Sequence, residues 1–447
     1  MIIKLIQPKM TLRPMDTSLK SRMAPSLGLL VIAQILRKEH TVIIEDENIS
    51  PLDYSKTADI VGISVTVNTV DRAAAIARNY KKIGAITIGG GIHISADPDR
   101  CENYFDSICI GPSETVWKEI IDDFETGKLK KRYQCNKAMC EKDIISPAYD
   151  LIDKSKYLYP NIIFTSYGCP FRCSFCYNSC EAYKNLYMNK PIENVISEIK
   201  LIDRKHIMFI DDNFIGKPEW TKEFLKALKP LHIKWNAAVS CNIINMLDLL
   251  DQMKECGCQG LFIGFESLKN DVVSNVNKVQ NNIDMYEKLI KEIHDRGMMV
   301  NASFVFGLDG EDISVFNNTL KWVVKNKIET VTSHILTPYP GTSLYKDFSN
   351  TGRITSFDYS EYDTAHVVFS PQLMTQDELY QGYINIYKQI YSFKNILKRI
   401  PLSKNQVIPY LLFNLFYRKY GKLTAFICQK IGYERLGKLS EKLSKYI

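Results

Sequence analysis

Short apolar segments alternate with segments of helical spacing along most of the chain, and this alternation limits the fold more than any other feature. In the first part, strands are expected at 2–6, 41–45, 59–65, 85–88 and 107–110. Helices are expected between them, at about 29–36, 70–83 and 115–125. Strand, helix and strand repeated in this order predict a parallel sheet with helices on both faces. Ligands of such a sheet bind where loops leave the carboxyl ends of the strands.

A second series of the same kind begins after a charged, irregular stretch. Its strands are expected at 162–167, 206–210, 234–239, 259–266, 299–306 and 329–336. Its helices are expected at 192–203, 217–228, 245–255, 284–296 and 315–325. Six such units predict a partial (β/α)6 barrel with its active site at the carboxyl ends of the strands. From about residue 357 the chain looks helical and basic, and Thr375-Gln-Asp-Glu378 is a capping box that opens a helix.

These patterns predict an α/β chain of four parts. We expect a doubly wound, Rossmann-like domain at 1–130, a linker at 131–160, a partial TIM barrel at 161–345 and a mostly helical C-terminal domain at 346–447. The length of 447 residues fits more than one domain. The last part is expected to cap the open barrel.

Charge and cysteine content narrow the function. The net charge of +7 is modest and not gathered into one run, so a nucleic-acid partner is not expected. The first residues show no charged-then-apolar leader pattern and no window is apolar enough to span a bilayer, so we expect a cytoplasmic protein. Disulfides are rare there, and the 12 cysteines are therefore candidates for metal ligands or small core residues.

The most informative segment is a C-x3-C-x2-C motif in the loop after the first barrel strand, formed by Cys169, Cys173 and Cys176. Three closely spaced thiolates can bind three irons of a 4Fe–4S cluster and leave the fourth iron open. An open iron can chelate the amino and carboxylate groups of S-adenosyl-L-methionine (SAM). Cys180 offers an alternative, because four ligands would make a closed zinc or electron-transfer site. The spacing matches neither the ferredoxin pattern nor paired zinc knuckles.

With Phe175 before its last cysteine, the motif resembles that of the radical SAM superfamily, and the likeness extends over about residues 160–345. The resemblance implies an iron–sulfur enzyme that cleaves SAM reductively to a 5′-deoxyadenosyl radical. It also implies SAM contacts at strand ends, from Asp211, Asp212, Glu266, Ser267 and the backbone at Phe306. Carboxylates at strand ends are often only helix caps. Because successive strand residues point in opposite directions, at most one of the two aspartates should face the barrel interior.

The N-terminal sheet resembles the cobalamin-binding (vitamin B12-binding) domain that precedes many radical SAM enzymes. Pro25-Ser-Leu-Gly28-Leu29 is similar to a stretch of that domain. The resemblance implies contacts to cobalamin from the strand-end loops, at Ser64, Thr66, Gly89, Gly90, Gly91, His93, Gly111 and Glu114. Glycine lets backbone approach a large flat ligand closely. The chain lacks a D-x-H-x-x-G motif, so base-off cobalamin without a protein histidine on cobalt is expected. A domain of this size can also be a relic or an oligomerisation surface.

Together these features predict a cobalamin-dependent radical SAM enzyme that methylates an unactivated carbon of a small molecule or lipid. A second possibility is the same architecture catalysing a radical rearrangement, cyclisation or oxidation without methyl transfer. A third is a non-catalytic Fe–S or zinc protein. A reductant such as flavodoxin or ferredoxin is the expected partner. The basic, aromatic helices near the C-terminus fit a solvated helix pair better than a membrane-binding surface.

Overall fold

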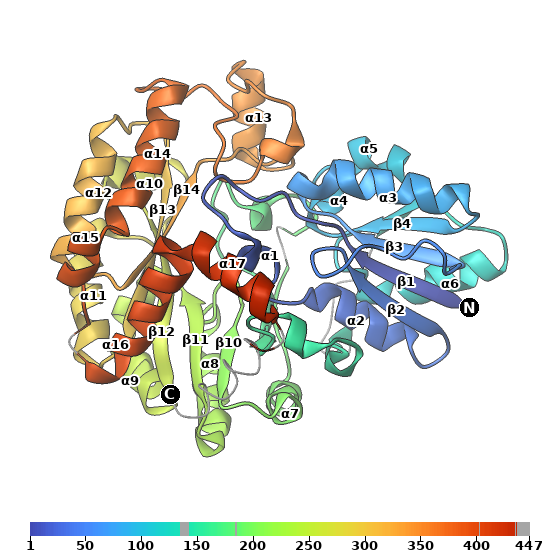
Figure 1. Ribbon diagram of the computed structural model, residues 1–447, viewed down its shortest axis with the longest axis horizontal. Helices are drawn as coiled ribbons and strands as arrows, with labels where there is room; N and C mark the ends of the chain where they lie inside the picture. Colours follow the sequence, from blue (N-terminus) through green and yellow to red (C-terminus); the bar gives the residue numbers. More distant parts are fainter. Residues whose placement is uncertain (135–142, 184–185, 402, 434, 436–447) are drawn as a thin grey trace.

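The computed structural model describes residues 1–134, 143–183, 186–401, 403–433 and 435. Its N-terminal sheet lies beside a larger, curved sheet that forms the barrel, and the C-terminal helices cover the barrel's outer side (Figure 1). Within the described residues no helix is long and apolar enough to cross a bilayer. The predicted α/β fold with two parallel sheets is confirmed.

The N-terminal sheet has six parallel strands in the order β2-β1-β3-β4-β5-β6. The strands are β1 (Ile2–Gln7), β2 (Thr41–Asp46), β3 (Ile60–Ser64), β4 (Ile86–Gly90), β5 (Ser107–Ile110) and β6 (Arg132–Gln134). The helices are α1 (Ser18–Ser21), α2 (Leu27–Leu36), α3 (Val70–Lys82), α4 (Ile92–Ala96), α5 (Pro98–Cys101) and α6 (Trp117–Glu125). Apolar residues of α2 and α6 pack on one face of the sheet, and those of α3 and α4 pack on the other.

The barrel sheet also has six parallel strands, in the order β14-β13-β12-β11-β10-β7. These are β7 (Ile162–Ile163), β10 (His206–Phe209), β11 (Lys234–Val239), β12 (Cys258–Glu266), β13 (Met299–Phe306) and β14 (Thr330–Ile335). The helices between them are α7 (Ile192–Ile202), α8 (Pro218–Leu228), α9 (Leu247–Glu255), α10 (Asn270–Asn275), α11 (Tyr286–Asp295) and α12 (Ser314–Lys325). Buried and half-buried residues alternate along β11 and β14, as expected for strands with one face on the helices and one toward the interior.

The C-terminal region after residue 342 is mostly helical, apart from a largely irregular stretch at 351–374. It contains α13 (Ser343–Asn350), α14 (Gln376–Ile390), α15 (Phe393–Lys398), α16 (Lys404–Leu411), a π-helical run (Leu412–Lys419) and α17 (Gly421–Ile431). The capping box of Thr375 and Glu378 that opens α14 is confirmed. The Tyr391 hydroxyl, at the end of α14, donates to the carbonyl of Val331 at 2.6 Å, which fixes α14 against β14. At the other end α17 packs on α1 through Leu19, Ala425 and Cys428.

Two details differ from the sequence prediction. The strand expected at 162–167 divides into β7 and β8 (Ser166–Gly168), and β8 pairs antiparallel with β9 (Tyr187–Asn189) outside the barrel sheet. The chain bends there because Asp211 binds the intervening backbone, as described below. The second difference is β6, which extends the N-terminal sheet from within the segment expected to be a linker. A three-residue edge strand with one buried side chain, Tyr133, carries too little pattern to be predicted.

Candidate active site

The three cysteines of the motif lie on a loop that leaves β8 and is held by two other segments. Gly168, just before the loop, has a φ of 71°, which favours glycine. The Ser174 amide donates to the carbonyl of Val276 at 3.0 Å, and the side-chain amide of Asn277 donates to the carbonyl of Arg172 at 2.7 Å. The segment that follows α10 therefore fixes the middle of the cysteine loop.

The thiols of the motif are close enough for the charge of one to shift the pKa of another. Burial, together with the charges of Asp212 and Cys173, raises the pKa of Cys169 to about 11 and that of Cys176 to about 12. Cys180 is buried, and its charge affects the pKa of Tyr177 and Tyr183.

Two side-chain amides approach the sulfur atoms. Asn178 Nδ2 lies 3.8 Å from Cys176 Sγ, and Gln280 Nε2 lies 3.6 Å from Cys173 Sγ. Such N–H···S contacts tune the reduction potential of Fe–S clusters. Among the described residues no three His, Cys, Asp or Glu side chains surround one common metal position. A mononuclear zinc site needs its ligands around one position, and the placement of these side chains disfavours it. In an Fe–S cluster each thiolate binds a different iron, so no such common position is required.

The two aspartates after β10 have different surroundings. Asp211 is 4% exposed, and its Oδ1 accepts from the amide of Thr165 at 2.8 Å and from the hydroxyl of Ser166 at 2.6 Å. It holds the bend between β7 and β8. The side chain of Asp212 is exposed, yet neighbouring parts of the chain shield its carboxyl from water enough to raise its pKa. Its charge acts on Cys169 and Cys176, so Asp212 is the aspartate that faces the cysteine loop.

Glu266 ends β12 in a left-handed conformation with a φ of 64°, at a register shift against β13. Its carboxylate forms a buried ion pair with Lys278. Burial lowers the pKa of Lys278, but Glu266 and the nearby Cys173 outweigh it and raise the pKa above its ordinary value. Ser267 is 1% exposed and donates to Glu311 Oε1 at 2.6 Å. A cation thus lies between the carboxylate of β12 and a thiol of the motif.

Phe306 offers no free side chain to a ligand. It is fully buried, and its ring packs on Phe316 of α12 at a centroid distance of 4.9 Å. The next amide, of Gly307, donates to Glu311 Oε2 at 3.1 Å, and the Phe306 carbonyl accepts from Leu336 at 2.8 Å. These two backbone groups already have partners within the chain, and the backbone contact of Phe306 to SAM stays a prediction.

Several buried polar atoms near the cysteine loop have no hydrogen-bond partner among the described residues. They are Asp211 Oδ2, Asn213 Nδ2, Gln280 Oε1 and Asn281 Oδ1. Unpaired buried polar atoms are costly, and several together mark a place where a polar ligand completes the hydrogen bonding.

A recess lies in the N-terminal domain, on the side of α2 and α6. Its empty volume is about 530 Å³, and four glycines line it, Gly28, Gly62, Gly90 and Gly91. A Cβ on Gly62 would lie 2.8 Å from Leu5, so the recess depends on the missing side chain. Trp117 also lines it, and its indole N–H is buried without an acceptor in the described part of the chain. A ligand with a flat ring and acceptor atoms fits this recess.

The structure divides the eight residues expected to contact cobalamin. Ser64, Gly90, Gly91 and Glu114 line the recess. The other four do not line it: Thr66, Gly89, His93 and Gly111. Thr66 caps the turn before α3, and a Cβ on Gly89 would meet Phe105 in the core at 2.6 Å. His93 is fully buried edge-on against Tyr359, and burial lowers its pKa to about 4.

Comparison with protein families identifies two domains. A model of the radical SAM superfamily matches residues 163–323, and a model of the B12 binding domain matches residues 21–121. The chain carries a radical SAM domain and a B12-binding domain. Its radical SAM barrel carries the cysteine loop, and its B12-binding domain carries the glycine-lined recess. A domain family of unknown function matches residues 342–410.

Relatives share this arrangement over nearly the whole chain. Bacteriochlorophyllide d C-12(1)-methyltransferase of Chlorobaculum tepidum is 28% identical over 431 residues, 93% of each chain. The C-8(2)-methyltransferase for bacteriochlorophyllide d of the same organism is 26% identical, covering 90% of this chain and 93% of the relative. Among solved structures, the cobalamin-dependent SAM radical enzyme OxsB, with aqua-cobalamin and SAM bound, has a TM-score of 0.69 at 13% identity, covering 95% and 72% of the two chains. This last likeness concerns the fold alone.

The B12-binding domain and the radical SAM barrel touch beside the cysteine loop. The hydroxyl of Tyr167, two residues before Cys169, donates to Glu114 Oε1 at 3.0 Å. Gly341, in the Thr337–Thr342 loop after β14, has a φ of 84°, and a Cβ there would lie 2.4 Å from the carbonyl of Ala96 in α4. Because Glu114 lines the glycine-rich recess, a single hydrogen bond joins that recess to the strand that leads into the motif.

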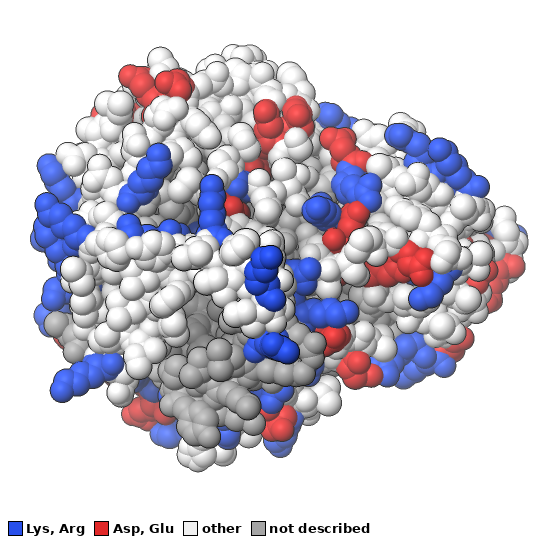
Figure 2. All heavy atoms as spheres, in the orientation of Figure 1, with Lys and Arg blue, Asp and Glu red and all other residues white. Residues whose placement is uncertain are grey.

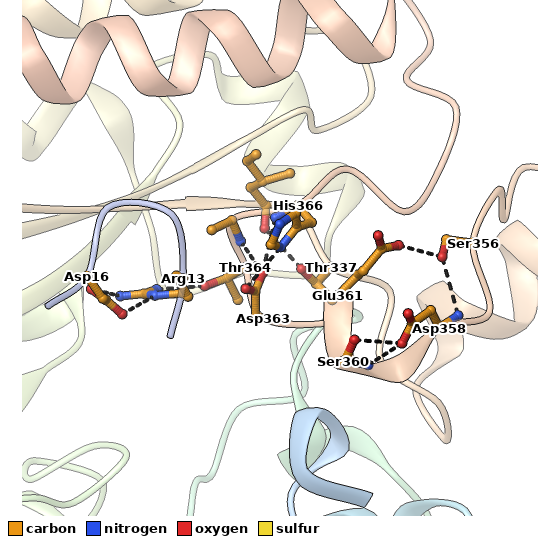
Figure 3. Close-up of polar contacts among 12 residues, drawn as sticks. Arg13, Asp16, Thr337, Ser356, Asp358, Ser360, Glu361, Asp363, Thr364 and His366 are labelled. Atoms are coloured by element: carbon orange, nitrogen blue, oxygen red, sulfur yellow. Dashed lines mark hydrogen bonds and ion pairs between the residues drawn. The ribbon is translucent and has the colours of Figure 1, made fainter. Parts of the chain in front are cut away.

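Chain segments from both ends close the far side of the barrel. Figure 3 shows Arg13 bound to Asp16 and to Thr364, with Asp363 and His366 paired beside them. Thr364 also hydrogen-bonds to Nδ1 of His334 on β14 at 2.9 Å. Burial, together with neighbouring cations, lowers the pKa of His334 to about 3. His334 is thus a neutral, hydrogen-bonded residue of the barrel wall.

The sequence reasoning missed Lys278, Gln280, Asn178 and Trp117. The first two lie in a polar loop after α10, far along the chain from the cysteines that they contact. Asn178 lies two residues after Cys176, and a side-chain amide so close to a thiolate is the one signal that could have been used. Trp117 begins an amphipathic helix, so its sequence position indicates a core residue rather than a ligand contact.

Proposed function

We propose that this chain is a cobalamin-dependent radical SAM enzyme that methylates an unactivated carbon of a small, largely apolar molecule. One observation carries the proposal. Cys169, Cys173 and Cys176 lie together on one loop, and the strand leading to them is hydrogen-bonded to Glu114, which lines the recess of the B12-binding domain. The two relatives named above are methyltransferases by name and match this chain from end to end.

The barrel interior supports an apolar substrate. On β10 the side chains of Ile207 and Phe209 are buried under the helices, whereas the intervening Met208 is 37% exposed and Ile210, just after the strand, is 43% exposed. Large apolar side chains that remain accessible on an inner barrel face favour an apolar ligand there. The relatives act by name on bacteriochlorophyllide d, which is therefore the first candidate substrate to test.

Residues of the barrel have separable roles in this proposal. Cys169, Cys173 and Cys176 are the ligands of the 4Fe–4S cluster, with Phe175 packed beneath them on the barrel core. Asp212 is placed to hold the ammonium group of SAM. Glu266 is fixed by Lys278, which also offsets the negative charge of the thiolates. When bound, the cluster and SAM supply a radical that removes hydrogen from the substrate, and cobalamin supplies the methyl group.

Cobalamin fits the glycine-lined recess through Ser64, Gly90, Gly91 and Glu114, with the N–H of Trp117 as an added donor. None of the residues that line the recess is a histidine. We therefore propose base-off cobalamin without a protein ligand from histidine. Electron paramagnetic resonance of the cobalt(II) form is expected to lack coupling to a coordinating nitrogen. Coupling to a nitrogen ligand would contradict this part of the proposal.

The domain boundaries and the setting follow from the same arrangement. We propose the B12-binding domain at 1–130, extended by β6, the linker up to 160, the barrel at 161–345 and the helical cap at 346–447. Thiolate ligands and a reducible cluster suit a reducing compartment, so we propose a cytoplasmic enzyme that takes electrons from flavodoxin or ferredoxin.

The test uses anaerobically reconstituted protein, SAM with a deuterated methyl group and a chemical reductant. The expected results are about four irons per chain, release of 5′-deoxyadenosine, and a product of bacteriochlorophyllide d heavier by one labelled methyl group. Iron binding and SAM cleavage without a labelled product would favour cyclisation, rearrangement or oxidation. Zinc in place of iron, or no 5′-deoxyadenosine, would favour the non-catalytic alternative.

Two matched variants test the ligand set. Cys176→Ala should lose the cluster absorbance and SAM cleavage, because one iron loses its ligand. Cys180→Ala removes a buried thiol four residues further along the chain and should keep both. Equal loss in the two variants would point to a four-cysteine site and overturn the assignment.

A further inference from the structure

The last helices of the chain expose apolar side chains to an unusual degree. Ten of the 21 exposed large apolar residues in the described part of the chain lie between 393 and 431. Six of them lie on α16, the π-helical run and α17: Ile408, Leu412, Phe416, Leu423, Phe426 and Ile427, each 42–60% exposed. Isolated exposed apolar residues are ordinary, but a gathered set marks an interaction surface.

These residues form one continuous surface, which we call the C-terminal apolar face. Ile408, Leu412 and Phe416 follow one another at intervals of four, so they share one side of the helical run. The hydroxyl of Thr424 donates to the carbonyl of Phe416 at 2.7 Å, which brings the start of α17 beside that run. Phe393 of α15 joins it through Tyr420, with ring centroids 6.0 Å apart.

The same helices bury their other side, so the exposure is not a sign of loose packing. Tyr410, Asn414, Ala425 and Cys428 are buried between the exposed positions. The Tyr410 hydroxyl donates to the carbonyl of Ile396 at 2.6 Å, and Asn414 Nδ2 donates to the carbonyl of Glu329 at 3.1 Å. The helices are therefore anchored to the barrel by one side and present an apolar stripe on the other.

The charge of this region has one sign. No aspartate or glutamate occurs from residue 379 to residue 433, whereas nine lysines and arginines do. Seven of the nine are lysines, and none of these forms an ion pair with a described residue. Lys419 Nζ lies 4.3 Å from the ring centre of Phe393, and Lys430 Nζ lies 5.7 Å from that of Phe426. In Figure 2 blue side chains border a largely white area in the position of these helices.

We propose that the C-terminal apolar face docks on the surface of a membrane that contains anionic lipids. Lysines around an apolar stripe match the two layers of such a surface, because the stems can lie among acyl chains while the ammonium groups reach the phosphates. A second copy of this chain is a poorer occupant, since it would bring like charges together. The helices are too short and too polar to span a bilayer, so they lie in its interface. The docking requires neither SAM nor cobalamin.

Flotation with lipid vesicles tests the proposal on the full-length protein. It should float with vesicles of phosphatidylcholine and about one-third phosphatidylglycerol at low salt, and remain behind with phosphatidylcholine alone. Each lysine near an anionic surface strengthens binding by about fivefold. Raising the salt concentration to about 0.5 M should release most of the protein, because the charges are then screened. Absence of flotation with the anionic vesicles would overturn the proposal.

Two matched double variants separate this surface from general stickiness. L423S/F426S replaces residues that are 56% and 55% exposed, and L201S/F357S replaces the same residue types, 62% and 61% exposed, elsewhere on the chain. The first should lower vesicle partitioning at least tenfold, because two apolar side chains no longer enter the interface. The second should leave it unchanged. Equal loss in both variants, or a dimer that L423S/F426S converts to a monomer without any vesicle binding, would contradict the assignment.

Discussion

Replacement of Lys278 by methionine is the most direct test of how the barrel holds its charged groups. The side chains of Lys278 and Glu266 are only 11% and 8% exposed, and they pair with each other next to Cys173. Methionine keeps most of the volume but leaves the Glu266 carboxylate buried without a cation. Removing one partner of a buried pair costs about 3–5 kcal/mol, whereas replacing both partners is close to neutral. We expect Lys278→Met to fall in the first range.

The assay is chemical unfolding of the cofactor-free protein, followed by a probe of the barrel such as tryptophan fluorescence. The double variant Lys278→Met with Glu266→Gln should recover at least about 2 kcal/mol of the loss, because the unpaired charge is gone. Lys269→Met is the matched control. It breaks the exposed pair with Asp312, whose side chains are 40% and 46% exposed, and should cost no more than about 1 kcal/mol.

The same variant has a second readout in the reconstituted protein. Loss of a cation beside Cys173 should shift the reduction potential of the cluster to more negative values, since the reduced cluster carries more negative charge. The reasoning is refuted if Lys278→Met is no less stable than Lys269→Met, or if the double variant is as unstable as the single one. Either result would mean that solvent, rather than the ion pair, compensates Glu266.

Three further outcomes are expected. Gly341→Ala should be less stable than Gly352→Ala, by about 1–3 kcal/mol in thermal unfolding, because both have a positive φ but only the first would place a Cβ against the B12-binding domain. Trp117→Phe should weaken cobalamin binding about fivefold to twentyfold in a titration without loss of stability, because it removes a buried N–H that has no protein acceptor. Burial raises the pKa of Glu311 to about 7, so the folded state binds the extra proton and stability should fall as pH rises from about 4.5 to 7, by up to roughly 3 kcal/mol. Glu311→Gln should remove this slope, and an unchanged slope would contradict the assignment.

The alternation of strands and helices was predictable because apolar residues recur at a different spacing in strands than in helices. Ten of the eleven predicted strands correspond to observed ones with ends that differ by at most two residues, as with 206–210 against β10 and 329–336 against β14. The failures lie where the backbone follows a tertiary contact rather than a pattern. The bend between β7 and β8 is fixed by Asp211, which lies 45 residues after Ser166.

The site was predictable only in part, for a similar reason. Cysteine spacing within one loop identified the three thiols, because those residues are neighbours in sequence and in space. Lys278 and Gln280 reach the same thiols from a loop about 100 residues later, and no local pattern reports such a contact. His93 shows the opposite error: it follows three glycines of a ligand loop, yet its own side chain turns into the core against Tyr359.

The junction between the domains explains how the glycine-lined recess and the cysteine loop can serve one enzyme. A methyl group carried by one domain can reach a carbon held by the other only if the domains keep a fixed distance, and effective positioning is worth several kcal/mol of the barrier. The contacts that set this distance are made by loops at the carboxyl ends of both sheets: Tyr167 with Glu114, and Gly341 with Ala96. The second of these accepts no side chain without moving the domains apart. Gly341→Ala should therefore reduce methyl transfer more than SAM cleavage. Only methyl transfer needs the glycine-lined recess and the cysteine loop at a fixed distance from each other.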